Sequence, residues 1–152
     1  MTDIAFHFSV PDKLAYSCRL LRKAYQSGAQ LVVIGAPDML AELDQMLWTF
    51  SASEFVPHYR PPADAKSATA LDKALEATPV LLVESVGSSV HQGVLVNLSS
   101  DIPDGFECFE RFIEVVSIQD SDRLAARRRW KHYADRGYTL QRHDLATAGE
   151  HA

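Results

Sequence analysis

The sequence predicts a three-layer α/β/α domain with a mostly parallel (mixed) sheet and a Rossmann-like topology that lacks a nucleotide site. Short, wholly apolar segments alternate with stretches of helical periodicity, which is typical of strands joined by crossover helices. The chain has 152 residues, of which 47% are hydrophobic and 23% charged, enough for one core. We therefore expect a single domain over residues 1–146 and a disordered tail over residues 147–152.

The first part of the chain predicts a βαβα arrangement. Residues 4–10 form a strand, and Asp12 opens a helix that ends at Gly28. The apolar face of that helix comprises Leu14, Cys18, Leu21 and Tyr25. Residues 31–34 form a second strand, and a second helix follows from Pro37. Its inward residues are Leu40, Leu43 and Leu47.

The rest of the chain continues the alternation with less regular spacing. A short strand over residues 55–58 precedes an alanine-rich segment, residues 65–77, which is a short helix or an ordered loop. Further strands are expected over residues 80–83, 93–97 and 112–116. The last helix begins after Ser121, a natural N-cap, and stops at Gly137.

The charges are distributed unevenly along the chain. Residues 1–120 hold 8 Lys and Arg against 16 Asp and Glu, a net −8, whereas residues 121–152 hold 7 against 4, a net +3. The whole chain has a net charge of −5. A basic segment on an acidic protein indicates an acidic partner.

The basic segment has helical spacing that groups its cations. Arg123, Arg127 and Lys131 recur every four residues and therefore project from one face, with Trp130 beside them. One interpretation is a docking surface. The other is an ordinary solvated face, with Trp130 and Tyr133 turned into the core.

A second candidate surface consists of aromatic residues at the end of the second helix and the start of the next strand. These residues are Trp48, Phe50 and Phe55. Since Leu47 continues the inward stripe, Trp48 points about 100° away from it. Exposed tryptophan is typical of protein interfaces, although Trp48 capping the edge of the core is the alternative.

Several functional classes lack their sequence motifs. There is no phosphate-binding GxxxxGK[ST] motif, and the loop after the first strand contains no glycine. The six histidines are dispersed, and Ser85, Ser88 and Ser89 lack the GxSxG nucleophile motif. His58 is either a general base or, as we favour, a structural hydrogen-bonding residue. We expect no catalytic residue, no bound metal and no cofactor, with Cys18 and Cys108 as free thiols.

The sequence also lacks membrane and export features. It has no run of about 18 apolar residues, and its first residues form neither a basic leader nor an apolar signal segment. We therefore expect a cytoplasmic protein.

Taken in order, several segments resemble the chi subunit family of bacterial DNA polymerase III. Each segment alone is weak evidence, but the segments match the family in order and spacing over most of the chain. The segments are residues 47–48 with 55–58, residues 94–98, residues 109–116, and residues 126–133 followed by 137, 138 and 140.

The resemblance implies a non-catalytic accessory subunit of the DNA polymerase III holoenzyme in DNA replication. In that family, chi pairs with the small psi subunit, which tethers it to the clamp-loader complex. Chi also binds the C-terminal tail of single-stranded-DNA-binding protein (SSB), which is acidic and ends in an aromatic residue with a free carboxylate. It is an adaptor between the polymerase and the coated template.

The resemblance further implies which residues bind each partner. The SSB-tail residues are Val116, Arg123, Arg127, Arg128, Trp130, Lys131, Gly137 and Leu140. Arg127 takes the terminal carboxylate with help from Lys131, and Arg123 and Arg128 attract the acidic residues upstream. Val116, Trp130 and Leu140 form the walls of an apolar pocket for the aromatic ring. The psi-binding residues are Trp48, Phe50 and Phe55, and in related proteins this corner also receives a helicase. Arg142 departs from the family pattern, where a smaller polar residue stands near the pocket.

Two rival classes of function stay open. A direct single-stranded nucleic-acid-binding module would use the same basic helix on phosphates and stack bases on Trp130 or Tyr133. The net charge of −5 argues against much direct nucleic-acid binding. An enzyme would need a convergent polar pocket, for which the sequence offers no residues.

Overall fold

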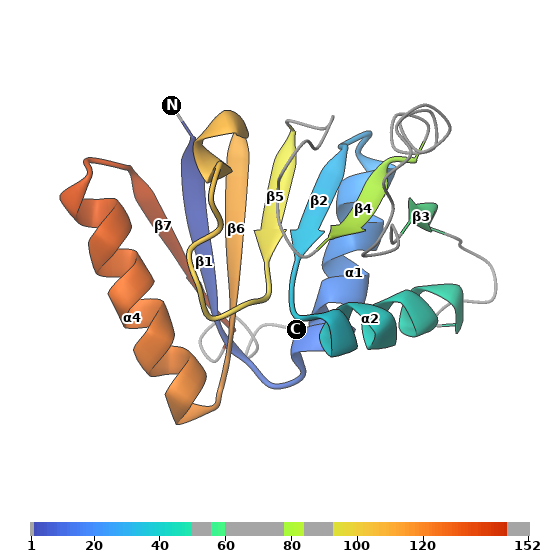
Figure 1. The fold of residues 1–152 in the computed structure, drawn as a ribbon, viewed down its shortest axis with the longest axis horizontal. Coiled ribbons are helices and arrows are strands. Elements are labelled where there is room, and N and C mark those ends of the chain that lie inside the picture. The colour runs from blue at the N-terminus through green and yellow to red at the C-terminus, as the bar shows by residue number, and fades with distance from the viewer. Residues whose placement is uncertain (1, 50–55, 60–77, 84–92, 146–152) are drawn as a thin grey trace.

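The computed structural model describes residues 2–49, 56–59, 78–83 and 93–145. Within these ranges seven strands form one sheet, in the order β3-β4-β2-β5-β6-β1-β7, and each pair is parallel (Figure 1). The elements in chain order are β1 (Asp3–Val10), α1 (Lys13–Gln26), β2 (Leu31–Ile34), α2 (Pro37–Thr49), β3 (His58–Tyr59), β4 (Val80–Val83), β5 (Val94–Asn97), the 3-10 helix η1 (Phe106–Cys108), β6 (Arg111–Ser117), α4 (Asp120–Asp135) and β7 (Leu140–Asp144).

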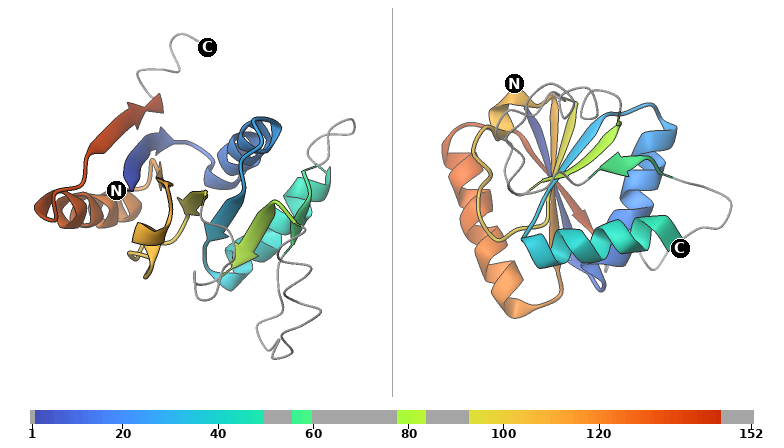
Figure 2. Two further views of the ribbon diagram at one scale, coloured as in Figure 1. Left: turned by 90° about the horizontal axis from the view of Figure 1, so that it is seen from above. Right: turned by 45° about the vertical axis from the view of Figure 1, so that its right-hand side comes forward.

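The sheet is covered on both faces, as the alternation of apolar segments predicts. In β2, Leu31 and Val33 belong to a core cluster shared with α1 and α2, whereas Val32 and Ile34 belong to a second cluster beneath α4. Figure 2 shows α4 on one side of the sheet and α1 on the other. The predicted three-layer fold is confirmed, and the described strands are parallel throughout.

The two N-terminal helices form where the sequence predicts them. The Asp12 side chain accepts a hydrogen bond from the Ala15 N–H at 3.1 Å and caps α1. The chain leaves the helix through Gly28, whose φ of 89° is in the left-handed region. On α2, Leu40, Leu43 and Leu47 are buried, as predicted.

The start of α4 differs from the prediction. Gln119, not Ser121, is the N-cap residue, and it makes no side-chain cap. The Gln119 carbonyl already accepts the first helical hydrogen bond, from the Arg123 N–H at 3.0 Å, so the helix begins two residues earlier. The Asp122 carboxylate accepts a hydrogen bond from the Ser117 N–H at 2.8 Å and holds the preceding chain against this first turn. The predicted stop is confirmed, because Gly137 has a φ of 85° and donates to the Ala134 carbonyl at 3.0 Å.

The sequence did not predict strand β7. It pairs with β1 in parallel, with Leu140 opposite Ile4 and Arg142 opposite Phe6. Its middle residues, Gln141 to His143, are polar and exposed, because β7 lies at the edge of the sheet. An edge strand of this kind has no apolar run to reveal it.

Some predictions fall on segments outside the described residues. They concern Phe50, Phe55, residues 65–77, the serines at 85–89 and the C-terminal tail at 147–152. Across the part of the chain that is described, no helix has the length and apolar character needed to span a bilayer.

Candidate functional site

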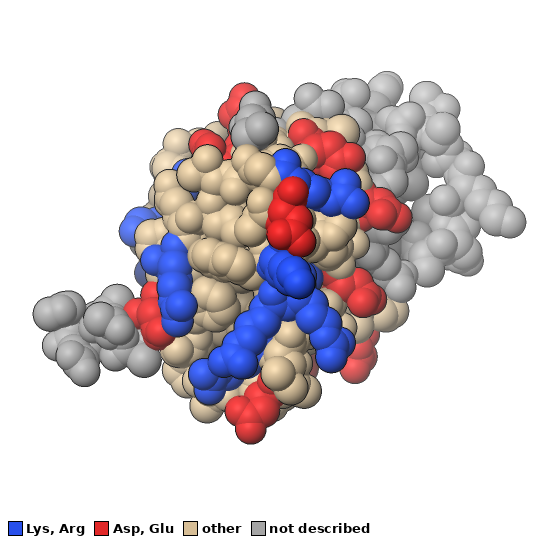
Figure 3. Space-filling model, turned by 90° about the vertical axis from the view of Figure 1, so that its left-hand side faces the viewer, with Lys and Arg blue, Asp and Glu red and all other residues tan. Residues whose placement is uncertain are grey.

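A pocket of about 290 Å³ lies where α4, β1 and β7 meet. Its lining residues are Phe8, Arg123, Arg127, Trp130 and Arg142. Figure 3 shows the side of the molecule with α4, where Lys and Arg side chains form bands across the surface. The pocket therefore combines two aromatic side chains with three guanidinium groups.

The spacing of α4 explains which of its side chains reach the pocket. Arg123, Arg127 and Trp130 lie at i, i+4 and i+7 and share one face of the helix. Arg129 and Tyr133 lie on the buried face, with exposed fractions of 2% and 0%. Arginines therefore occur on both faces of α4: Arg123 and Arg127 on the pocket face, and Arg129 on the buried face.

The aromatic side of the pocket is continuous with the core. The Trp130 ring lies 5.0 Å from the Phe6 ring and 6.1 Å from the Phe8 ring, centroid to centroid. Trp130 is half-buried, so it packs on the core and still presents surface to the pocket. Tyr133, in contrast, belongs wholly to the core.

Arg142 completes the pocket from the opposite wall. Its guanidinium carbon lies 4.9 Å from the centre of the Phe8 ring, a cation–π contact. One of its nitrogens, Nη2, lies 3.5 Å from Asp144 Oδ2. Cations therefore face the aromatic rings from both α4 and β7.

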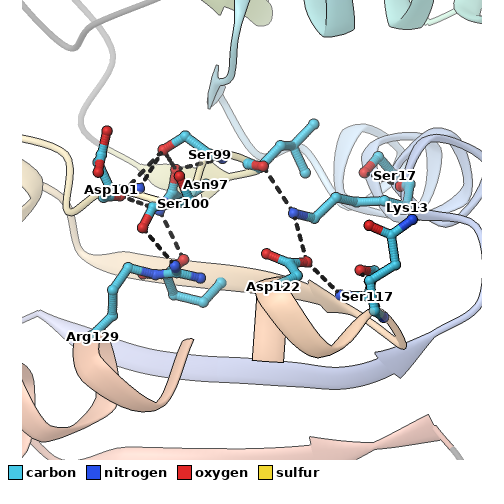
Figure 4. A network of polar contacts seen from close by, with 12 residues as sticks. Lys13, Ser17, Asn97, Ser99, Ser100, Asp101, Ser117, Asp122 and Arg129 are labelled. Atoms are coloured by element: carbon cyan, nitrogen blue, oxygen red, sulfur yellow. Dashed lines mark hydrogen bonds and ion pairs between the residues drawn. The ribbon is translucent and has the colours of Figure 1, made fainter. Parts of the chain in front are cut away.

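A buried polar network fixes α4 against the sheet. Glu114, in the middle of β6, is completely buried and accepts hydrogen bonds from Arg129 Nε at 3.0 Å and Tyr133 Oη at 2.7 Å. Asn97 Nδ2 donates to its other oxygen at 2.8 Å. Arg129 Nη1 donates to the Ser100 carbonyl at 2.9 Å, as Figure 4 shows. The rotation of α4 is set by these bonds, and with it the direction of Arg127 and Trp130.

The ionisation of the network follows from its burial. Burial raises the pKa of the Glu114 carboxyl, while the neighbouring Arg129 guanidinium and the hydrogen bonds of the network oppose that rise. Burial and the adjacent Glu114 raise the pKa of Tyr133, so its hydroxyl stays protonated and donates a hydrogen bond to Glu114. The network is a structural unit rather than an acid–base site.

A second ion pair anchors the beginning of α4. Lys13 Nζ lies 3.0 Å from Asp122 Oδ2 and donates to the Leu98 carbonyl at 2.9 Å (Figure 4). Burial acts to raise the pKa of Asp122, but the hydrogen bond from the Ser117 N–H and the Lys13 ammonium bring it below its ordinary value. Charge pairs therefore hold α4 at its first turn, through Asp122, and again past its middle, through Arg129.

The structure brings together only part of the tail site that the family resemblance implies. Arg123, Arg127 and Trp130 line the pocket, whereas Arg128 and Lys131 are exposed on α4 outside it. Val116 is completely buried beneath α4, so it supports the pocket without forming its wall. The remaining two residues are Leu140, half-buried against the same cluster, and Gly137, which ends α4.

The pocket also contains Phe8, which neither the sequence pattern nor the family resemblance places there, and Arg142, which the resemblance places near the pocket without a role. Phe8 stands in the apolar wall for which the resemblance implies Val116, and Arg142 forms the far cationic wall. Phe8 has a sequence feature that could have identified it: it continues the two-residue alternation of Ile4 and Phe6 to the end of β1. Arg142 has no such sequence feature, because its place in the pocket depends on β7, which the sequence did not predict.

The aromatic corner at the other edge of the sheet is simpler. Trp48 is 60% exposed, and its ring contacts the His58 ring at 5.0 Å in a T-shaped arrangement. His58 Nε2 lies 3.0 Å from Asp44 Oδ1, and His58 Nδ1 lies 2.7 Å from the Val56 carbonyl. These contacts favour the structural interpretation of His58.

A larger crevice, of about 1270 Å³, lies at the carboxyl ends of the strands, where Rossmann-like proteins bind nucleotides. The described residues of its lining include four aspartates, Asp12, Asp101, Asp104 and Asp122, and one cation, Lys13, that is paired with Asp122. This described part of the lining therefore offers a phosphate no unpaired positive charge. Among the described residues, no group of three His, Cys, Asp or Glu side chains could hold a metal ion.

Comparison with known proteins gives one consistent result. Residues 1–141 match the family described as DNA polymerase III chi subunit, HolC. The chain is 34% identical over 134 residues to the DNA polymerase III subunit chi of Pseudomonas aeruginosa, covering 88% of this chain and 87% of that protein. The chi subunits of Haemophilus influenzae and Escherichia coli are 26% and 24% identical, covering 82% and 81% of this chain and 81% and 79% of those proteins. This chain belongs to the DNA polymerase III chi subunit family, a non-catalytic accessory component of that polymerase.

Proposed function

We propose that this chain is an adaptor that links the clamp-loader complex to SSB. The pocket between α4 and β7 binds the acidic C-terminal tail of SSB, and the Trp48 corner binds the psi subunit. The observation that carries the proposal is the pocket itself, in which three arginines surround two aromatic rings on a protein whose net charge is −5. We place this activity in the cytoplasm, with the replication machinery.

The chemistry of the pocket suits a peptide that ends in an aromatic residue. Arg127 is exposed and can hold the terminal carboxylate in a charge-assisted hydrogen bond. The aromatic ring of the peptide can stack against Phe8 and Trp130, which already make tilted ring contacts with each other. Arg123 lines the pocket and would pair with acidic side chains farther from the terminus.

The exposed cations outside the pocket have a different role in this proposal. Arg128 and Lys131 do not line it, but both lie on the exposed surface of α4. Positive charges outside a binding pocket raise the rate at which an acidic peptide encounters the protein more than they raise the affinity of the complex.

The exposed side chain of Trp48 supports the proposal that psi binds at the aromatic corner formed by Trp48 and His58, which we call the Trp48 corner. Leu47 is buried, whereas Trp48 leaves 60% of its surface accessible. An exposed indole held beside His58 is the kind of side chain that anchors protein interfaces. A helicase partner at the same corner would compete with psi for Trp48.

Binding of single-stranded nucleic acid is the second candidate function, and the same arginines and Trp130 are the observation that favours it. The burial of one side of Trp130 against Phe6 reduces the ring area that a base could stack on. The overall negative charge also opposes a polyanion that extends beyond the pocket.

The experiment that tests the proposal compares three ligands by fluorescence anisotropy. They are a peptide copying the C-terminal tail of the SSB protein from the same organism, the same peptide with an amidated terminus, and an oligothymidylate. We expect micromolar binding of the first peptide, a loss of at least tenfold on amidation, and no binding of the oligonucleotide. Equal binding of both peptides would contradict the carboxylate contact, and tighter binding of the oligonucleotide would favour the second candidate.

The two tryptophans allow an independent readout. In a Trp48→Phe variant the remaining indole is Trp130, which lines the pocket. We expect its emission to change on addition of the free-carboxylate peptide. An unchanged emission at saturating peptide would place the binding site elsewhere.

A further inference from the structure

We propose that Arg142 is a specificity-determining residue of the pocket, and that it binds the acidic side chain nearest to the terminus of the bound peptide. This inference rests on the proposed function of the pocket as a site for an acidic peptide end. It adds to that function a second anion-binding wall, supplied by β7.

The strand register places Arg142 on the pocket side of the sheet. Arg142 pairs with Phe6 and Asp144 pairs with Phe8, and side chains at paired positions of parallel strands share a face. Phe6 contacts Trp130 from α4, so this face is the one that α4 covers. Arg142 consequently approaches the pocket from the wall opposite Arg123 and Arg127.

The contact with Phe8 holds the guanidinium in place for a ligand. Arg142 lies over the Phe8 ring at 4.9 Å, and a guanidinium stacked on a ring keeps its N–H groups free to donate in its own plane. A peptide ring entering beside Phe8 would therefore bring its neighbouring acidic groups within reach of Arg142.

The charge of the pocket favours a ligand that carries more than one anionic group. Arg123, Arg127 and Arg142 all carry a positive charge at neutral pH and line the same space of about 290 Å³. One terminal carboxylate neutralises a single unit of that charge. A ligand with a carboxylate side chain as well as the terminal carboxylate matches the site better than a neutral peptide end does.

The internal partner of Arg142 leaves room for such a ligand. The Nη2 to Oδ2 distance of 3.5 Å to Asp144 is longer than a good charge-assisted hydrogen bond, and the Arg142 side chain is 64% exposed. A carboxylate brought in by the peptide would compete successfully with Asp144. Asp144 thus acts as a mild internal competitor for the same guanidinium.

A double-mutant cycle tests this inference. The protein forms are the natural chain and Arg142→Gln, and the two peptides are the natural SSB tail and a version whose acidic residue nearest the terminus is replaced by its amide. We expect Arg142→Gln to weaken the natural peptide about fivefold and the amide version less than twofold. Arg19→Gln is the matched control, since Arg19 is exposed on α1, on the other face of the sheet, and we expect it to change neither affinity.

A second variant gives a change of opposite sign. Asp144→Asn removes the internal competitor and should tighten the natural peptide about twofold, but only when Arg142 is present. Equal losses for both peptides with Arg142→Gln, or no loss at all, would overturn the role of Arg142. In that case a loss with Arg127→Ala would still support the proposed function, whereas no binding to the natural chain would overturn both.

Discussion

The two candidate partner surfaces lie at opposite edges of one sheet and differ in construction. The pocket beside β7 is concave and cationic, and its lining comes from β1 near the start of the chain and from the consecutive elements α4 and β7. The Trp48 corner beside β3 consists, among the described residues, of one exposed indole next to His58 and the helix α2. One surface can recognise the chemical identity of a chain end, and the other offers apolar area.

This difference has a structural counterpart beneath each surface. Behind the pocket, four buried polar side chains, Asn97, Glu114, Arg129 and Tyr133, fix α4 to the sheet. Behind Trp48, the buried residues that the structure describes are mainly leucines of α2, and the polar side chain among them is His58, which contacts Asp44 and the Val56 carbonyl. Recognition by directed hydrogen bonds needs a rigid backing, whereas recognition by apolar contact tolerates small adjustments of the surface. Four predictions test whether the two surfaces are separate in this sense.

The largest effect is expected from Glu114→Gln. The change leaves the buried Arg129 charge without its counter-ion and should lower the free energy of unfolding by about 3 to 5 kcal/mol. Urea denaturation followed by circular dichroism measures it, with the exposed Glu110→Gln as a control that should lose less than about 0.5 kcal/mol. A loss below about 1 kcal/mol would show that the Glu114–Arg129 pair contributes little to holding α4.

Arg127→Ala should produce the next largest effect, on tail binding only. The lost charge-assisted contact should cost about 2 to 3 kcal/mol of affinity for the SSB-tail peptide, with psi binding unchanged. Isothermal titration with each partner measures both. Arg136→Ala, at the end of the same helix and outside the pocket, is the matched control. A weakened psi complex in Arg127→Ala would break the separation of the two surfaces.

Trp48→Ala should show the opposite selectivity. Removal of the exposed indole should weaken the psi complex by about 2 kcal/mol and leave the tail affinity unchanged. The comparison needs co-purification or titration with psi and the anisotropy assay with the tail peptide. If psi binding survives intact, the psi interface lies elsewhere on the domain.

The smallest effect is expected from salt and distinguishes the two surfaces without mutation. Raising the salt concentration from about 0.05 to 0.5 M should weaken tail binding about fivefold, because the arginines that line the pocket act through exposed charge pairs. Psi binding through apolar contacts should change little. A salt-independent tail affinity would mean that the aromatic rings supply most of the binding.

Much of the fold follows from the sequence because its core strands are apolar on both faces. The segments predicted at residues 31–34, 80–83 and 93–97 contain the buried strands β2, β4 and β5, and the leucine stripe of α2 is buried as its period predicts. That period leaves two interpretations of Trp48 open, and the structure agrees with the exposed one. These patterns are local, so a single sequence reveals them.

The missing parts of the site depend on contacts between distant residues. Val116 reads as a pocket wall in the family pattern, but α4 covers it completely. Arg129 belongs to a basic run, yet its pairing with Glu114 on β6 buries it. The sequence shows neither the burial of Val116 nor that of Arg129. The arginine of α4 that turns inward is the one that faces Glu114, the single carboxylate of β6, and this pairing is a contact between separate elements.

The pairing of the last described strand with the first has a consequence for how the protein is made. A chain that has emerged from the ribosome as far as the end of α4 already contains Phe8, Arg123, Arg127 and Trp130, but β7 and Arg142 are still to come. Since β7 must align beside β1 across more than 130 residues of sequence, the closure of the pocket is among the most non-local steps of folding. Chains that end before β7 would then carry the basic helix without the finished pocket, so selective tail binding would begin only once β7 has been synthesised.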